Sequence, residues 1–133
     1  MRSTKIAPGE HYHVFNRGVG KNDIFFDERD KIRFLVSILY FQSSIIISNP
    51  SYYVSHFREH RVFPNSKKTL DKILENRVVE LVNFCLMPNH FHLTLFEKEE
   101  GGISHYMQRI QNAYTKYFNT KYKKSGHLFD RAV

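Results

Sequence analysis

The stretch that decides the fold is VVELVNFCLMPNHFHLTLF, residues 78–96. Its first half is rich in apolar and β-branched residues with little polar interruption, which is typical of a strand in the middle of a sheet. The turn at 87–89 (MPN) is predicted to be tight, because proline fixes φ and asparagine tolerates the left-handed region. The second half alternates, with His90 and His92 on one face and apolar residues on the other. We therefore expect a β-hairpin with a short loop.

Segments on both sides of this hairpin complete an α+β pattern. Residues 11–17 predict a strand, and the carboxylate of Asp27 is a good N-cap for a helix that ends near residues 40–43. Ser104 can cap a helix running to about residue 122, and 127–129 can begin a final strand. This order predicts a ferredoxin-like split βαβ fold, an antiparallel sheet with both helices on one face and the histidines on the other.

Residues 43–78 interrupt the pattern, and we interpret them as an insertion carrying one short helix at 67–77. Leu70, Ile73 and Leu74 have the spacing of its inward side.

The second long helix carries a stripe at helical spacing. The stripe consists of Met107, Ile110, Gln111, Tyr114, Tyr117 and Phe118. Lys116 lies off this stripe and is expected to reach water, whereas the spacing of Tyr114 is typical of a core residue.

Composition excludes several classes of protein. The chain has 133 residues and 41% hydrophobic residues, which suits one globular domain, 1–133. No apolar run approaches the roughly 20 residues of a membrane helix, and the N-terminus lacks a secretory signal. Cys85, the single cysteine, excludes an intramolecular disulfide and is expected to be buried and inert. We expect a soluble cytoplasmic protein with no membrane partner.

The positive net charge of the chain is consistent with two interpretations: it binds a polyanionic partner, or it only keeps the protein in solution. The net charge is +7, and residues 101–133 hold six Lys or Arg and one Asp. Aromatic residues make up 15% of the chain, and cations with stacking rings are how single-stranded nucleic acids are held. Composition alone does not choose between this interpretation and a basic surface that only keeps the protein in solution.

His90 and His92 are the candidate site. Two histidines at i and i+2 on a strand place both imidazoles on one face, where they can share a divalent metal. Taken alone, such a pair is more often an accident of an exposed strand. Here Phe91 anchors the strand between them, and the preceding turn sets their direction.

Five segments carry a resemblance to a known family. They are LMPNHFHL at 86–93, YHVFNRG at 12–18, IFFDERDKIRFL at 24–35, ISHYMQRIQNAYTKYFN at 103–119 and SGHLF at 125–129. Together they resemble the REP-associated tyrosine transposases, within the HUH (His-hydrophobic-His) single-tyrosine transposases of small insertion sequences. The resemblance covers most of the chain outside 43–78.

This resemblance implies a metal-dependent nuclease and strand transferase that acts on single-stranded DNA next to short hairpins. In the family, two histidines and a carboxamide hold Mg²⁺ or Mn²⁺, and a tyrosine attacks the scissile phosphate. The products are a 5′-phosphotyrosine link and a free 3′-OH. His90 and His92 match the metal pair, and a homodimer is a possible assembly.

The chain departs from the family at the nucleophile. Relatives carry a pattern like Tyr-Ile-His-x-Asn-Pro on a further helix, and no such pattern occurs before Val133. Where relatives continue with Gln-Gly-Arg-Phe-Lys, residues 130–133 read Asp-Arg-Ala-Val. Three explanations stay open: a piece of a longer enzyme that lacks the tyrosine helix, a short copy that binds hairpin DNA without cutting, or another tyrosine. Tyr114 is the candidate for the last, although its helix is expected behind the sheet, so that it could act only across a dimer.

Further side chains are candidate DNA contacts, with an ordinary solvated surface as the alternative. They are Arg17, Lys21, Lys116, Tyr117, Lys121, Lys123 and Lys124. His11 and His13 can neighbour the histidine pair if their strand pairs with that of His90. RNA binding on the same scaffold is a weaker alternative, because histidines stand where stacking rings are expected.

Overall fold

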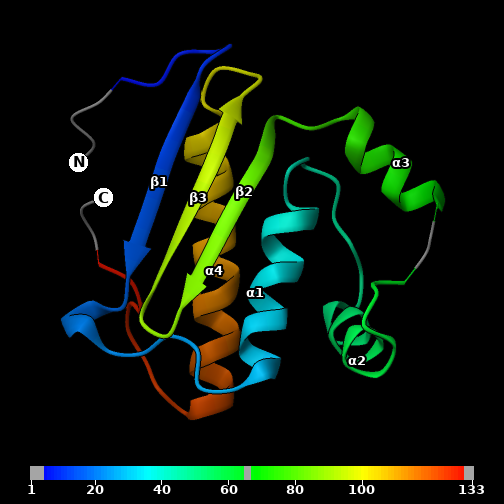
Figure 1. Cartoon of the computed structure of the whole chain (residues 1–133). Coiled ribbons are helices and arrows are strands. Elements are labelled where there is room, and N and C mark those ends of the chain that lie inside the picture. Colours follow the sequence, from blue (N-terminus) through cyan, green and yellow to red (C-terminus); the bar gives the residue numbers. More distant parts are fainter. Residues whose placement is uncertain (1–4, 65–66, 131–133) are drawn as a thin grey trace.

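The computed structural model describes residues 5–64 and 67–130, and these form an α+β fold (Figure 1). In chain order the elements are β1 (His11–Arg17), the short 3-10 helix η1 (Val19–Lys21), α1 (Glu28–Tyr40), α2 (Pro50–His60), α3 (Lys67–Glu75), β2 (Val79–Met87), β3 (His90–Glu97) and α4 (Gly102–Tyr122). The strands form a three-stranded antiparallel sheet of order β1-β3-β2. Helices α1 and α4 lie behind one face of this sheet (Figure 1).

The hairpin forms as predicted, with a two-residue loop, but its second strand rather than its first is central. The prediction of a central first half was wrong. On β3, Phe91, Leu93 and Leu95 are all fully buried, and the strand pairs with β1 along one edge and with β2 along the other. On β2, a register shift between Leu81 and Asn83 breaks the alternation and leaves apolar side chains in water at the sheet edge.

Cys85 lies on this edge strand and is exposed, so the prediction of a buried thiol was also wrong. The register explains the error. Cys85 is the partner of His92 and therefore shares its face of the sheet. Apolar neighbours in sequence do not bury a residue that points away from the core.

Both long helices form, and their first turns show why they begin where they do. Asp27 is the N-cap of α1, and its side chain accepts a hydrogen bond from the Asp30 N–H at 2.8 Å, as predicted. Helix α4 begins at Gly102, two residues before the predicted cap at Ser104. Of the N–H groups at its start, that of Ile103 donates to the buried carboxylate of Glu97 at 2.6 Å, and that of Gly102 donates to the Glu99 carbonyl at 3.0 Å.

The insertion holds two helices, α2 and α3, rather than the one predicted. Helix α2 has little amphipathic signal, since Val54 is its only fully buried side chain. In α3 the predicted inward side is only partly inward: Ile73 is buried, whereas Leu70 and Leu74 are exposed. The two helices build a second, smaller apolar cluster against α1.

The end of the described chain returns to β1. Phe129 forms an isolated antiparallel bridge with Gly18, and Leu128 and Phe129 are buried in the main core. The predicted final strand is therefore present only as this bridge within the described residues, and the four-stranded ferredoxin-like sheet stays a prediction. The rest of the predicted tail, residues 131–133, lies outside the described residues. Within 5–64 and 67–130, no helix combines the length and apolar character that crossing a bilayer requires.

Candidate functional site

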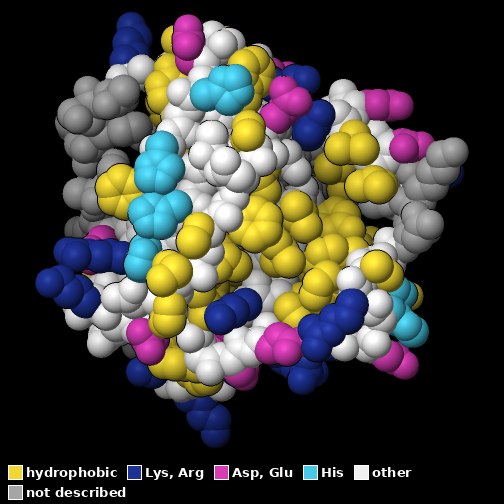
Figure 2. Space-filling view, viewed as in Figure 1, with side chains coloured by type: hydrophobic (Ala, Val, Ile, Leu, Met, Phe, Trp, Pro, Cys, Tyr) yellow, Lys and Arg dark blue, Asp and Glu magenta, His cyan; other side chains and the backbone are white. Residues whose placement is uncertain are grey.

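The two faces of β3 are chemically different. Apolar side chains alternate with partly exposed ones along the strand, and the apolar ones belong to the core in front of α1 and α4. His90 and His92 are among the partly exposed side chains. Figure 2 shows histidine side chains in a row on the accessible face of the sheet, with Lys and Arg side chains nearby.

A third histidine joins the pair from the neighbouring strand. Nε2 of His13 lies 3.1 Å from Nδ1 of His92, and the centroids of the two rings are 5.0 Å apart. The ring centroids of His90 and His92 are also 5.0 Å apart. The expectation that His13 neighbours the pair is confirmed, because β1 pairs with β3. His11 is the more distant one and packs its ring against Phe96 instead. We call His13, His90 and His92 the histidine cluster.

The hairpin turn that aims His90 is tied to the segment after β1. Nδ1 of His90 lies 2.8 Å from the side-chain oxygen of Asn89. The Asn89 carbonyl accepts a hydrogen bond from the Gly18 N–H at 2.9 Å, and the Pro88 carbonyl accepts two more from the segment before α1. Only glycine fits at position 18, since a Cβ there would lie 2.0 Å from the carbonyl oxygen of Asn22. The turn is therefore held in place from outside the hairpin.

The environment of His92, the middle member of the histidine cluster, favours its neutral imidazole. Partial burial and then the nearby rings of His13 and His90 lower the pKa of His92. A neutral ring is the form that coordinates a metal. Across the described ranges, however, no three His, Cys, Asp or Glu side chains are arranged to hold one ion. The facing nitrogens of His13 and His92 are at hydrogen-bond distance from each other, and the tautomers of the two rings decide which nitrogen donates.

Several predicted DNA contacts lie at one end of the molecule. The turn between β2 and β3, the segment after β1 and the C-terminus of α4 gather there (Figure 1). Arg17 is the register partner of His90, and Nε of Arg17 lies 2.6 Å from Asp130. Lys21, Lys123 and Lys124 are exposed at this end of the fold. Lys116 is exposed on α4, as the helical spacing predicted.

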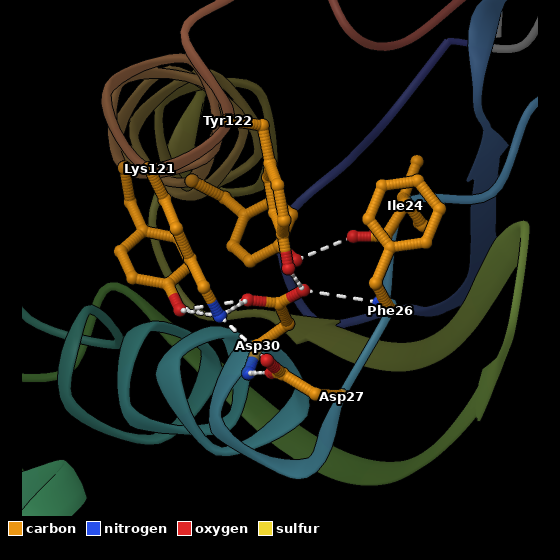
Figure 3. Close-up of polar contacts among 8 residues, drawn as sticks. Ile24, Phe26, Asp27, Asp30, Lys121 and Tyr122 are labelled. Carbon is orange, nitrogen blue, oxygen red and sulfur yellow. Dashed lines mark hydrogen bonds and ion pairs between the residues drawn. The ribbon is translucent and has the colours of Figure 1, made fainter.

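Tyr117 and Lys121, two of the predicted DNA contacts, donate hydrogen bonds to Asp30, which was not among the predicted site residues. Asp30 is fully buried, and its carboxylate accepts hydrogen bonds from Lys121 at 2.8 Å, from Tyr117 at 2.7 Å and from Tyr122 (Figure 3). Burial by itself raises the pKa of Asp30, but the hydrogen bonds from Lys121 and the two tyrosines outweigh it and lower the pKa. The sequence feature that could have revealed this network is an acidic residue among the buried positions of α1. This network joins α1 to the end of α4.

Tyr114 lies in the main core, as its spacing predicted. It is 1% exposed, and its hydroxyl donates a hydrogen bond to the carbonyl of Ile24. Burial, followed by the nearby Asp30, raises the pKa of Tyr114 far above the usual range for tyrosine. This placement gives no support to Tyr114 as a nucleophile. All eight tyrosines fall within the described residues, and none of them hydrogen bonds or stacks with the histidine cluster.

One comparison with known proteins gives a match. The family model described as "Transposase IS200 like" matches residues 42–132, which include the hairpin and α4 but not β1. No curated protein and no solved structure matches the chain.

Proposed function

The chain belongs to the IS200-like transposase family, and from this premise we propose that it binds single-stranded DNA carrying hairpins, in reactions of DNA transposition. The observation that carries the proposal is the histidine cluster on the accessible face of the sheet. In this cluster, Nε2 of His13 lies 3.1 Å from Nδ1 of His92. Arg17 is the register partner of His90, and Lys21 lies beside the hairpin turn, where its carbonyl accepts a hydrogen bond from the Asn89 side chain. The net charge of the chain is +7. Cations beside an open site supply the sequence-independent part of the affinity for DNA.

His90 and His92 are the residues that would hold the divalent ion. Imidazole nitrogens suit transition metals better than Mg²⁺, which prefers oxygen ligands, so this donor set favours Mn²⁺ of the two ions expected. When bound, such an ion polarises a scissile phosphate and stabilises the charge on its oxygens. The chain itself would hold the two imidazoles in position. The hairpin turn contributes to this, because the Asn89 carbonyl accepts a hydrogen bond from the Gly18 N–H.

Cleavage of the family's kind needs a tyrosine hydroxyl at this site. A bond forms between the tyrosine oxygen and phosphorus as the bond from phosphorus to the 3′ oxygen breaks. The hydroxyl proton is lost and the leaving oxygen takes one up, which gives a 5′-phosphotyrosine and a 3′-OH. The covalent intermediate splits one transfer into two steps.

A second candidate function is binding of hairpin DNA without cleavage by this chain alone. It is favoured by the tyrosines, because none of them contacts the histidine cluster. Cleavage would then require a tyrosine from elsewhere, including a second copy in a homodimer.

A single-stranded oligonucleotide with a hairpin, labelled at its 3′ end, tests both candidates. We expect the chain to bind it more tightly than a duplex of the same length, with a logarithmic salt slope of roughly −0.7 for each phosphate contacted. His90→Ala should leave most of this binding intact, because the phosphate contacts come from cations. Equal affinity for hairpin and duplex contradicts the proposal.

The same oligonucleotide incubated with Mn²⁺ separates cleavage from binding. A labelled protein–DNA adduct that survives denaturing electrophoresis, and that His90→Ala abolishes, establishes cleavage. Binding without an adduct establishes the second candidate. Lys68→Ala, an exposed substitution on α3 outside the histidine cluster, is the control and should leave binding and adduct formation as in the wild type.

A further inference from the structure

Phe15 is an aromatic side chain that the fold leaves in water. It is 52% exposed on β1 and shares a face with His13 and Arg17, each two residues away. Its register partner on β3 is His92, and its ring centroid lies 5.8 Å from the ring centroids of both His92 and His13. The inward side of β1 is made by Val14 and its alternate neighbours, so Phe15 is not needed to fill the core.

We propose that Phe15 is a base-binding subsite, on which one nucleobase of single-stranded DNA stacks beside the histidine cluster. The inference rests on the proposed function and deepens it. A phenyl ring offers a π-face and no hydrogen-bonding group, so it accepts any base. A base inside a duplex cannot present its face to this ring, and the subsite therefore selects an unpaired nucleotide.

Arg17 gives this subsite a companion for the phosphate. It stands next to Phe15 on the same face, opposite His90. Its Nε is paired with Asp130 at 2.6 Å, and its side chain is 53% exposed. Asp130 is the only side chain in the described part of the protein that bonds to this guanidinium. The ion pair orients the group while its two terminal nitrogens remain available for an anion.

The surroundings favour a nucleotide over a protein partner. Surfaces that bind another protein usually carry a contiguous apolar patch with a polar rim. Here the Phe15 ring packs against the imidazoles of His13 and His92, and the next residue on its face of β1 is Arg17. An exposed ring with imidazoles beside it and an arginine next along the strand matches the alternation of base and phosphate in a single strand.

Replacing the ring tests the inference. The probe is the hairpin oligonucleotide with 2-aminopurine placed in turn at each unpaired position. We expect Phe15→Leu to weaken binding about fivefold or more, the loss given by removing one base–aromatic stack. The fluorescence change of the stacked 2-aminopurine should disappear with it. Phe15→Tyr keeps the ring and should keep both signals.

Tyr52→Leu is the matched control, because Tyr52 is 53% exposed on α2, on the other side of the molecule from β1 (Figure 1). It should bind as the wild type does. Urea unfolding shows whether each variant is folded. If the wild type binds and Phe15→Leu keeps the affinity and the fluorescence change, the subsite is overturned and the proposed function stands. If the wild type fails to bind the oligonucleotide, both are overturned.

Discussion

At the scale of single residues, Asp30 shows how a buried charge is made stable. Its carboxylate is fully buried, yet it accepts hydrogen bonds from Lys121, Tyr117 and Tyr122 and from the Phe26 N–H at 3.0 Å. A buried carboxylate without such donors costs several kcal/mol, by order of magnitude. Removing the charge from this network leaves donors that no longer have an anionic partner.

We therefore expect Asp30→Asn to lower the free energy of unfolding by about 3 kcal/mol at pH 7. Because the folded-state pKa of Asp30 is lowered, the stabilisation is fully present above the unfolded pKa, about 3.9, and is lost as pH falls through the folded pKa. The gap between the wild type and Asp30→Asn should narrow below about pH 4. Urea unfolding at pH 7 and pH 3 measures both effects.

The control for this experiment is Asp71→Asn, which changes an exposed carboxylate on α3. It should alter the free energy of unfolding by less than about 0.5 kcal/mol at either pH. A gap for Asp30→Asn that stays constant between pH 7 and pH 3 would contradict the role of its ionisation.

At the scale of elements, Glu97 connects the central strand to the longest helix. It is the last residue of β3 and is fully buried. Its two carboxylate oxygens accept hydrogen bonds from the Ile103 N–H at 2.6 Å and the Gly101 N–H at 3.1 Å. A carboxylate at a helix N-terminus also meets the positive end of the helix dipole. The side chain thus fixes where α4 starts relative to the sheet.

Glu97→Ala should lower the free energy of unfolding by about 3 kcal/mol, because two buried N–H groups lose their acceptor. Glu97→Gln keeps one acceptor oxygen and should cost less. Urea unfolding gives the free energies, and amide hydrogen exchange at Ile103 reports fraying of the first turn of α4. Glu99→Gln, at an exposed neighbouring carboxylate, is the control. If Glu97→Ala and Glu99→Gln were equally stable, the capping role would be wrong.

At the scale of the whole molecule, α1 separates two apolar clusters of unequal size. Phe34 and Ile38 face the main cluster under the sheet, whereas Ile32 and Val36 belong to the second cluster with α2 and α3. The second cluster holds fewer buried side chains and no strand of the sheet. Local stability follows the density of buried apolar contacts.

We expect the α2–α3 region to open at lower free energy than the sheet. Val54→Ala, which truncates a side chain only 2% exposed, should cost about 2 kcal/mol and speed amide exchange in α2. Exchange at β3 should change little, and hairpin DNA binding should be retained. Native-state hydrogen exchange checks this. Equal protection of α2 and β3 in the wild type would show that the protein opens as one unit.

The sequence by itself determined the elements whose signals are local. Alternation predicted the hairpin, the Pro88-containing turn predicted its loop, and Asp27 predicted the start of α1, all of which the structure confirms. The helical spacing of α4 predicted a buried Tyr114 and an exposed Lys116. These features depend on residues within a few positions of one another, so period and capping chemistry suffice.

The tertiary structure decided what depends on contacts between distant segments. Pairing of β1 with β3 made the second hairpin strand central and brought His13 to His92 across 79 positions of the chain, and the β2–β3 register placed Cys85 on the exposed face. Packing of α4 on α1 brought Lys121 within hydrogen-bond distance of Asp30, 91 positions away in the chain. A local pattern specifies which face of a strand or helix is apolar, but the partner that covers that face is chosen by the packing of the whole core.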